Sequence, residues 1–474
     1  MTLPRYEPVT EAVAKELESI VGSENVSARQ EDLICASYDS SLLRYRPEVV
    51  VTPNTTEQVA AVLRLANTRR IPLTPRGAGT GSAGGALPVK GGICLDMFAM
   101  NKVVSFDPDN LMVVVEPGLI CDALNEFLEK HGFFFPPDPA SSAGCTIGGM
   151  VNTNAAGNRA MKYGTTKDHV LWLEVVLPTG EIITTGSATL KSVSGFDLTR
   201  LIVGSEGSLG VVTKIGLRVT PLPEAYVTSL YIFNTIEEAV RTAVGIRTRG
   251  IIPGMLEFLD VTTAKVVFEY TKLPFPLGYV VLVDCDGYEE AAERQATLVD
   301  EIANKETPIF AERAPDIATR DQFITARKSA FPALARLRPT AQLEDLTVPV
   351  TKIPEACVKI EAIPKRLAIP GFDLGLFGHI GDGNLHPTFI FDERDKVQRD
   401  AFFQALDILY REVALPLGGS ITGEHGIGAL RAPYIELEHG PVATNLMREI
   451  KKAFDPNMIL NPYKGKGGPW PIKR

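Results

Sequence analysis

The stretch PRGAGTGSAGG, residues 75–85, decides the fold, because it closes an extended segment and opens a glycine-dense loop. It contains a GxGxxG string, which in a Rossmann domain leads directly into a helix whose N-terminus faces a pyrophosphate. Here Pro88, Gly91 and Gly92 follow within a few residues, and no helical period appears. The sequence therefore excludes a Rossmann turn. It leaves two interpretations open: a tight turn between strands, or a nest of backbone N–H groups that holds a phosphate.

Upstream of this loop the pattern predicts strand, helix and strand. The first strand is Val49-Val50-Val51, and Thr55 can cap the helix, with Gln58 three positions later completing a capping box. Apolar residues then recur at helical spacing over 59–66, and residues 71–74 return to an extended pattern.

Downstream, the composition divides the chain at the proline-rich segment 220–223. Before it, short β-branched runs alternate with Gly and Pro turns, at 112–115, 173–177, 181–185 and 211–219. After it, we expect helices at 236–249, 288–304 and 396–414 and a buried strand at 278–284. Helices that alternate with strands in this way indicate a smaller α+β domain after this segment.

Length, charge and cysteine usage exclude several classes of protein. The 474 residues suggest two or three domains, and 45% hydrophobic against 22% charged residues is typical of a globular chain. The net charge of −9 without a Lys/Arg cluster argues against nucleic acid as a partner. There is no apolar run of about 18 residues, no signal-peptide core at the start and no CxxC pair. We therefore expect a soluble, cytoplasmic protein without disulfides or iron–sulfur clusters.

Further glycine-dense segments favour the phosphate-binding interpretation of the loop. They are PPDP at 136–139, GCTIGG at 144–149 and LIVGSEGSLG at 201–210. Small residues at so many positions allow the backbone to approach a large flat ligand along its length, which a single tight turn does not require.

These motifs together resemble one family of flavoproteins. PRGAGTGSAGG, EPG (116–118), PPDPAS (136–141), TIGGMVNTNAAG (146–157), KYG (162–164), GFDLTRLIVGSEGSLGVVT (195–213) and FDPNMILNP (454–462) are similar to the FAD-binding family of vanillyl-alcohol oxidase type. The resemblance covers nearly the whole chain. Within the family it is strongest to glycolate oxidase FAD subunits and D-lactate dehydrogenases, and weaker to D-2-hydroxyglutarate dehydrogenases.

The resemblance implies a fold and a set of cofactor residues. The fold is a two-subdomain FAD-binding domain (1–223), a ferredoxin-like substrate or cap domain (224–415) and a C-terminal helical segment that returns to the FAD domain (416–474). The loop residues Arg76, Gly77, Ala78, Gly79, Thr80, Gly81 and Ser82 would cradle the pyrophosphate. Pro137, Asp138, Thr146, Gly148, Gly149, Asn152, Gly157, Gly207 and Val212 would line the cofactor. Because residues 75–85 contain no histidine for a covalent link, we expect non-covalent FAD.

Two histidine motifs lie near the C-terminus. In GHIGDGNLHP (378–387) the GDGN centre predicts a chain reversal that brings His379 towards His386, and GEHGIG (423–428) follows. Two imidazoles and a carboxylate suit a divalent ion, with Zn²⁺ preferred and Fe²⁺ or Mn²⁺ as alternatives. From spacing alone a hydrogen-bonded core histidine remains open. The resemblance assigns His379, His386 and Glu424 to the metal and His425 to proton abstraction.

The segment ARKSAFP (326–332) resembles the one that supplies an arginine for the substrate carboxylate, which implies Arg327. A surface helix with basic residues is the alternative. Relatives specific for dicarboxylates carry Thr and Lys downstream of this arginine, where Phe331 and Leu343 stand here, and Thr388 replaces their usual Asn. Apolar residues at these positions favour a short monocarboxylate.

We therefore expect an FAD- and metal-dependent enzyme that oxidises D-lactate or glycolate to pyruvate or glyoxylate. The alternatives are a D-2-hydroxyglutarate dehydrogenase and a flavin-bearing electron-transfer subunit with an idle substrate site. Because the chain has no cysteine cluster and no haem-attachment motif, electrons would leave to an electron-transferring flavoprotein, an iron–sulfur subunit or a quinone. Any association with the inner membrane would then be made through such a partner.

Overall fold

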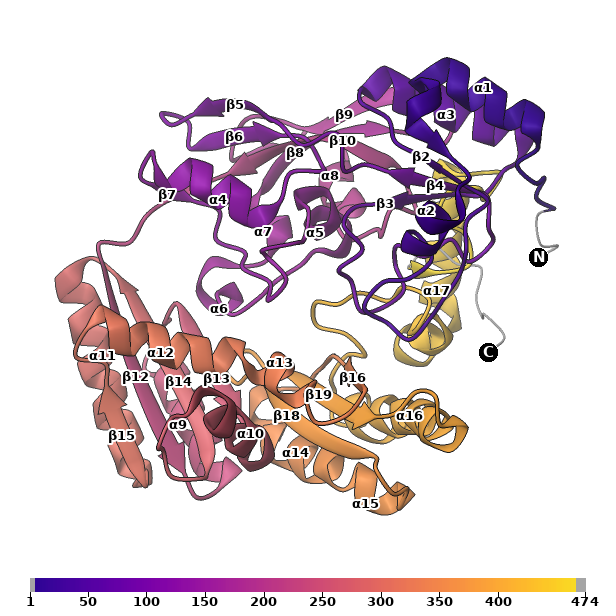
Figure 1. Cartoon of the computed structure of the whole chain (residues 1–474). Helices are drawn as coiled ribbons and strands as arrows, with labels where there is room; N and C mark the ends of the chain where they lie inside the picture. Colours follow the sequence, from indigo (N-terminus) through magenta and orange to yellow (C-terminus); the bar gives the residue numbers. More distant parts are fainter. Residues whose placement is uncertain (1–4, 466–474) are drawn as a thin grey trace. The chain divides into compact units, whose positions relative to one another are not determined.

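A computed structural model describes residues 5–465 of the chain and divides it into two compact units (Figure 1). The first unit comprises the residues up to 157, 164–222 and those from 424 onward. The second unit comprises residues 158–163 and 223–423. Relative to the ranges expected from the sequence, the second unit gains 158–163 and Pro223 from the N-terminal range and 416–423 from the C-terminal one.

The first unit begins with a small sheet in the strand order β1-β2-β4-β3. Its strands are β1 (Val26–Ser27), β2 (Val49–Val51), β3 (Leu73–Arg76) and β4 (Ile93–Asp96). Both β2 and β3 pair with β4 in parallel. The helices α1 (Glu11–Val21), α2 (Gln30–Cys35) and α3 (Thr56–Arg69) accompany it. Residues 77–92, between β3 and β4, form no helix, which confirms that the glycine loop is not a Rossmann turn.

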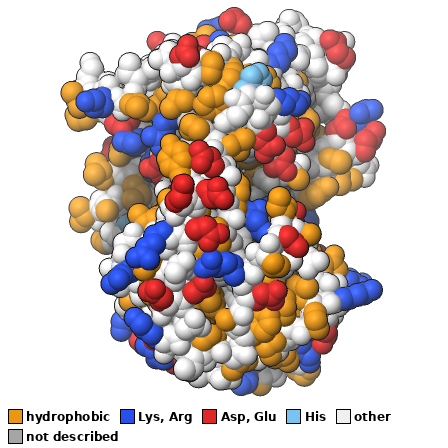
Figure 2. Space-filling model, turned by 90° about the vertical axis from the view of Figure 1, so that its left-hand side faces the viewer, with side chains coloured by type: hydrophobic (Ala, Val, Ile, Leu, Met, Phe, Trp, Pro, Cys, Tyr) orange, Lys and Arg blue, Asp and Glu red, His pale blue; other side chains and the backbone are white. Residues whose placement is uncertain are grey.

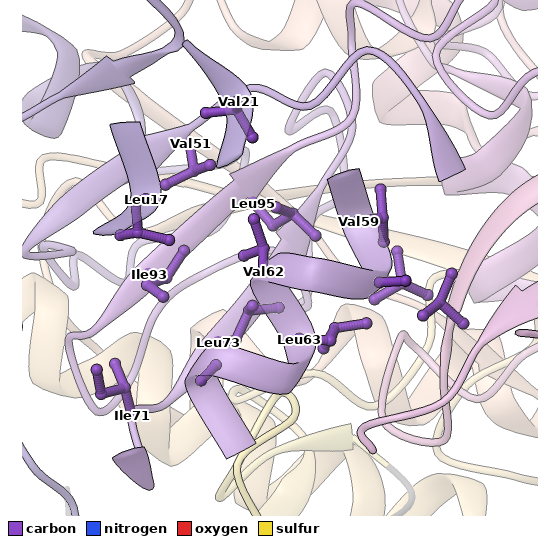
Figure 3. Packing of buried hydrophobic residues seen from close by; sticks show 14 of the residues in the cluster. Leu17, Val21, Val51, Val59, Val62, Leu63, Ile71, Leu73, Ile93 and Leu95 are labelled. Atoms are coloured by element: carbon purple, nitrogen blue, oxygen red, sulfur yellow. The ribbon is translucent and has the colours of Figure 1, made fainter. Parts of the chain in front are cut away.

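Helix α3 shows how closely the local sequence specifies this region. Oγ1 of Thr55 accepts the N–H of Gln58 at 3.3 Å, as a capping residue should. The Gln58 side chain reaches one residue further back than expected and accepts the N–H of Asn54 at 2.7 Å. Figure 3 shows Val62 and Leu63 on the buried face of α3, in a hydrophobic cluster with Leu73, Ile93 and Leu95 of the sheet.

A second, antiparallel sheet of the first unit has the order β5-β6-β10-β8-β9. Its strands are β5 (Val103–Asp107), β6 (Met112–Val115), β8 (Val170–Val176), β9 (Ile182–Gly186) and β10 (Val211–Arg218), and a separate ladder joins β7 (Phe133–Phe134) to β11 (Thr220–Pro221). Its helices are α4 (Cys121–Glu129), α5 (Ile147–Thr153), α7 (Thr166–His169) and α8 (Leu198–Ile202). One hydrophobic cluster connects α4 and α5 to β6, β8 and β10, so the short helices rest on a rigid sheet.

The C-terminal segment returns to the first unit through buried polar contacts. Helix α17 (Ile435–Phe454) carries Lys451, whose ammonium is fully buried and lies 2.6 Å from the Asp455 carboxylate. The same ammonium donates to the carbonyls of Ser208 and Leu460, both at 2.7 Å. A buried cation with three oxygen partners fixes the tail against the glycine turn at 204–210.

The second unit is built on one antiparallel sheet in the order β15-β12-β14-β13-β18-β19-β16, with β17 paired to β19. Its strands are β12 (Ala225–Phe233), β13 (Met255–Leu259), β14 (Tyr279–Gly287), β15 (Phe310–Arg313), β16 (Thr340–Leu343), β17 (Leu346–Thr347), β18 (Asp373–His379) and β19 (Asn384–Phe391). The helices are α6 (Ala160–Tyr163), α9 (Ile236–Thr248), α10 (Val261–Thr271), α11 (Glu289–Ala303), α12 (Ile317–Lys328), α13 (Ala330–Leu334), α14 (Ile353–Glu361), α15 (Ile363–Leu367) and α16 (Lys396–Ile408).

Specific contacts explain why two short segments belong to this unit. Lys162 and Tyr163 of α6 both bond the buried side chain of Asp286 at the end of β14. Ser420 forms an isolated bridge with Thr347 of β17, so the segment before Gly423 continues the edge of the sheet.

No helix in the described range 5–465 is long and apolar enough to cross a lipid bilayer. On the face shown in Figure 2, acidic and basic side chains are interspersed with hydrophobic ones.

Candidate active site

The glycine loop 76–82 is held by its own arginine and by the start of α5. Arg76 donates from Nη2 to the carbonyl of Tyr38 at 2.8 Å, so the predicted phosphate-loop arginine also fixes the segment after α2. Gly79 adopts a φ of +70°, and a Cβ there would meet the Arg76 guanidinium at 2.1 Å. At Gly77 a Cβ would lie 2.3 Å from Oγ1 of Thr146. These contacts require glycine at two positions of the loop.

The predicted cofactor residues of α5 are joined to the turn that contains Gly207. Thr146 caps α5 by accepting the N–H of Gly149 at 3.1 Å. Asn152 accepts the N–H of Gly207 at 3.0 Å and donates to the carbonyl of Gly148 at 2.7 Å. Three motifs that lie far apart in the sequence therefore form one continuous backbone surface in the first unit.

Close backbone approaches explain two further glycines of the predicted set. A Cβ at Gly148 would lie 2.5 Å from the Pro117 side chain, and one at Gly157 would lie 2.4 Å from the carbonyl oxygen of Asp138. Val212 differs from the others, because it is buried in the hydrophobic cluster around β10 and α5 and supports the surface from behind.

A cavity of about 870 Å³ opens beside the glycine loop in the first unit. It is lined by Arg76, Gly77, Ala78, Gly79, Asp96 and Phe98 and by residues of the segment 23–38. Its volume lies within the usual range for small-molecule and cofactor sites. The segment 23–38 carries no glycine motif that would predict a place in the cavity, and the pairing of β1 with β2 brings it there.

In the second unit, the hairpin of β18 and β19 brings the two predicted histidines together. The loop 380–383 reverses the chain, and Asp382 stabilises it by accepting the N–H of Asn384 at 3.1 Å. The ring centroids of His379 and His386 lie 5.0 Å apart, with ligand nitrogens within 4.8 Å. The expected reversal at GDGN is confirmed.

One buried carboxylate connects His379 to Arg327. Glu257, in the middle of β13, lies 2.7 Å from Nδ1 of His379 through Oε1 and 2.6 Å from Nη2 of Arg327 through Oε2. Burial raises the pKa of the Glu257 carboxyl, but its contacts with His379 and Arg327 outweigh this, and the net pKa shift is downward. The Glu257 carboxylate is therefore ionised beside both side chains.

Arg327 is further fixed by its packing. Its guanidinium lies 5.0 Å from the centre of the Phe377 ring, and its Nε is buried without a hydrogen-bond partner among the described residues. A buried donor in this state is suited to a ligand carboxylate.

A second buried carboxylate, Asp345, organises the chain next to His386. It accepts the Asn384 amide at 2.6 Å, the Thr422 hydroxyl at 2.5 Å and the N–H of Gly423 at 2.8 Å. Its ligand oxygen lies within 4.8 Å of a His386 ring nitrogen. Gly423 is therefore anchored at the hairpin, one peptide bond before Glu424.

Glu424 and His425 begin the return of the chain to the first unit. Oε1 of Glu424 lies 3.6 Å from Nε2 of His425, and both side chains are mostly buried. The following residues are fixed by Glu206, which accepts the N–H groups of Ile427 and Gly428, both at 2.7 Å. Glu206 was not singled out from the sequence, although an acidic residue between glycines in GSEG is a recognisable signal.

The three positions that the sequence associates with substrate size are half-buried and apolar, or fully buried. Phe331 and Leu343 are half-buried and pack against the hydrophobic cluster that contains Ala326 and Phe377. Thr388 is fully buried on β19 and pairs in register with Leu343.

Two family models match the chain. Residues 47–186 match an FAD-binding domain, and residues 222–465 match the C-terminal domain of FAD-linked oxidases. Together they cover the glycine loop, the start of α5, the histidine hairpin and the C-terminal tail.

Proteins of known name are similar over almost the whole chain. The glycolate oxidase subunit GlcD of Bacillus subtilis is 39% identical over 96% of this chain and 97% of its own length. The mitochondrial cytochrome D-lactate dehydrogenase of Arabidopsis thaliana is 34% identical (96% and 82%), and a probable D-2-hydroxyglutarate dehydrogenase of Oryza sativa subsp. japonica is 31% identical (97% and 83%).

Solved structures agree in fold. The p-cresol methylhydroxylase structure superposes with a TM-score of 0.79 at 18% identity, covering 97% of this chain and 98% of that one. An alkyldihydroxyacetonephosphate synthase gives 0.73 at 20% identity, with 98% and 86% covered. These likenesses confirm the expected fold of vanillyl-alcohol oxidase type. The chain belongs to the family of FAD-linked oxidases, in the group of glycolate oxidase subunits, D-lactate dehydrogenases and D-2-hydroxyglutarate dehydrogenases.

Proposed function

We propose that this protein oxidises a short D-2-hydroxy acid, D-lactate or glycolate, to the 2-oxo acid, using non-covalently bound FAD and a divalent metal ion. The observation that carries the proposal is the contact chain His379–Glu257–Arg327. This chain of contacts joins a histidine, which is a common metal ligand, to a guanidinium whose buried Nε has no hydrogen-bond partner among residues 5–465. Oxidation of a 2-hydroxy acid uses both a group that holds its hydroxyl oxygen and a group that holds its carboxylate.

The donor set suits a divalent ion. His379 offers Nε2, because its Nδ1 is bonded to Glu257, and a ring nitrogen of His386 lies within 4.8 Å of a His379 ring nitrogen. Glu424, one peptide bond after the anchored Gly423, is the proposed third ligand. Two imidazoles and a carboxylate favour Zn²⁺, with Fe²⁺ or Mn²⁺ as alternatives.

Different residues of the chain are proposed to take the proton and to bind the carboxylate of the substrate. FAD, when bound, would supply a hydride acceptor, and a metal ion held by His379, His386 and Glu424 would supply polarisation of the hydroxyl oxygen. His425 accepts the hydroxyl proton, and a histidine with a reference pKa of about 6.5 can do so near neutral pH. Arg327 donates to the substrate carboxylate and orients C2. The acid thereby loses one proton and one hydride and becomes the 2-oxo acid.

Residue types favour a short acid over a dicarboxylate. The half-buried Phe331 and Leu343 offer no hydrogen bond to a distal carboxylate, and a charged group left unpaired against apolar side chains is strongly rejected. D-2-hydroxyglutarate is the second candidate substrate, because one relative is named a probable D-2-hydroxyglutarate dehydrogenase.

Electrons are proposed to leave the reduced flavin to an electron-transferring flavoprotein, an iron–sulfur subunit or a quinone. The six scattered cysteines include no CxxC pair for a cluster on this chain.

One experiment separates the alternatives. The protein is mixed anaerobically with D-lactate, glycolate or D-2-hydroxyglutarate while the flavin absorbance is followed. Bleaching by D-lactate or glycolate at low concentration is the expected result. Bleaching by D-2-hydroxyglutarate alone would assign the second candidate, and no bleaching by any of the three would indicate an electron-transfer subunit with an idle site.

A further inference from the structure

We infer that Glu257 is the positioning residue that couples the metal site to the carboxylate-binding site, an inference that rests on the proposed function. Its carboxylate is hydrogen-bonded to His379 through Oε1 and forms an ion pair with Arg327 through Oε2. A single side chain in the middle of β13 therefore sets the separation and the orientation of two groups from β18 and α12.

The geometry restricts His379 to one tautomer. A carboxylate only accepts, so the 2.7 Å contact places a proton on Nδ1 and leaves the lone pair of Nε2 for a metal ion. Carboxylates that accept from a metal-ligating histidine fix its ring and raise its basicity. Because Glu257 is fully buried in the sheet, the ring cannot turn without breaking this contact.

The same carboxylate determines which donors Arg327 keeps for a ligand. Nη2 is taken by Glu257 at 2.6 Å, and the guanidinium lies against the Phe377 ring. The buried Nε remains without a hydrogen-bond partner within the part of the chain that the structure describes. The ion pair with Glu257 and the packing on Phe377 thus fix the position of the guanidinium, and its Nε can donate to a ligand carboxylate.

The Glu257 carboxylate also compensates the positive charge of Arg327 next to the proposed metal ligands. The Glu257 carboxylate lies 2.6 Å from Arg327 and so compensates the guanidinium before a ligand binds. Without the carboxylate, the buried guanidinium would lie near the metal ligands uncompensated, which would weaken the binding of a cation.

Helix α12 contains a matched control pair. Arg320, two helical turns before Arg327, lies 2.9 Å from the buried Asp284 carboxylate of β14 and 4.3 Å from the centre of the Tyr226 ring. This pair has the same chemistry as Arg327 with Glu257, including burial and an aromatic ring, but its carboxylate contacts neither histidine. Removing the charge of Asp284 therefore measures how much stability is lost when a buried ion pair of the same helix is broken.

The experiment compares the FAD-loaded wild type with Glu257→Gln, Glu257→Asp and Asp284→Asn. Zn²⁺ affinity is measured by competition with a chromophoric chelator, and KM and kcat for D-lactate by dye reduction. Glu257→Gln is expected to weaken Zn²⁺ binding about 10- to 100-fold and to raise KM about tenfold, at unchanged FAD content. Glu257→Asp retains the charge, but its side chain is too short to reach both His379 and Arg327. This variant should therefore change Zn²⁺ affinity and KM to different extents. Asp284→Asn should lose stability with wild-type Zn²⁺ affinity and KM.

The outcomes distinguish the inference from the proposed function. If wild type oxidises D-lactate and Glu257→Gln matches Asp284→Asn in both Zn²⁺ affinity and KM, the inference is wrong and the proposed function stands. If wild type oxidises none of the short acids but Glu257→Gln still loses Zn²⁺ affinity relative to Asp284→Asn, the metal-positioning role stands and the proposed substrate is wrong. A wild type without measurable Zn²⁺ affinity overturns the positioning role.

Discussion

Gly77 and Thr146 are in such close contact that a Cβ on Gly77 would lie 2.3 Å from the Thr146 hydroxyl oxygen. Thr146 lies 69 positions after Gly77 in the sequence, yet the Gly77 backbone and the Thr146 side chain leave no room for a methyl group between them. The same hydroxyl caps α5 at Gly149, so it cannot turn away without releasing the helix. The predicted pyrophosphate loop and the start of α5 are therefore held together by one side chain.

Gly77→Ala should reduce FAD occupancy strongly, because the added methyl group must displace Thr146 from its capping position. Gly85→Ala in the same loop is the control, since a Cβ there meets its nearest atom, Oε2 of Glu206, at an ordinary 3.7 Å. The ratio of flavin to protein absorbance after purification measures the effect. Equal FAD content in the two variants would contradict the steric argument.

His386→Ala should remove one equivalent of divalent metal and nearly all turnover while FAD stays bound, because the glycine surface lies in the other unit. Elemental analysis and the flavin spectrum together check this prediction. His131→Ala, which removes an exposed imidazole in the first unit, controls for adventitious metal. Wild-type protein without stoichiometric metal, purified in the absence of chelators, would argue against the assignment.

Glu361→Gln should stabilise the protein above neutral pH. Burial first, and then the charge of Asp260, raise the pKa of Glu361 to about 7. An unfolded glutamate titrates near 4.3, so the folded state holds the extra proton between these values and stability falls as pH rises through that window. The gain at pH 8 should be about 1 kcal/mol after allowance for partial exposure, and it should be largely absent at pH 5.

Urea unfolding at both pH values measures this gain. Glu355→Gln on the same helix is the control, because hydrogen bonds to Lys359 and Lys352 lower the pKa of that exposed carboxyl. The control should show no stabilisation at pH 8. A Glu361 variant no more stable than wild type at pH 8 would disprove the prediction.

FAD should be released by acid. The loop PRGAGTGSAGG contains no histidine that could carry a covalent flavin bond, so precipitation with acid should leave the yellow cofactor in the supernatant. Flavin fluorescence of the pellet and the supernatant decides the matter. Colour retained in the washed pellet would show a covalent bond at another residue.

Artificial dyes should be reduced much faster than oxygen or NAD. The chain has no cysteine cluster for further redox centres, and its GxGxxG string belongs to a loop without a following helix. Steady-state turnover with D-lactate and each acceptor tests the expectation. Oxygen consumption at the rate of dye reduction would indicate a self-sufficient oxidase and remove the need for an electron-accepting partner.

Local features of this protein were determined by the sequence alone. The Thr55 cap, the helical period that follows it and the reversal at GDGN depend on neighbouring residues, and all are present in the structure. The bounds shifted by a few residues where a tertiary contact extended a strand, as at β14, expected at 278–284 and observed over Tyr279–Gly287 opposite β12. Backbone propensity and side-chain periodicity act over a few residues, so a single sequence contains them.

Only the tertiary structure decided which distant residues meet. Glu257 stands in MLEFL, an apolar strand in which its single charge is the one visible signal, and nothing near it in sequence names His379 or Arg327 as its partners. The segment 23–38 joins the cavity by strand pairing, and Thr146 meets Gly77 through packing. Such contacts depend on how sheets and helices stack after they form. The physical cost of burying a charge then ensures that a partner is present without specifying which residue it is.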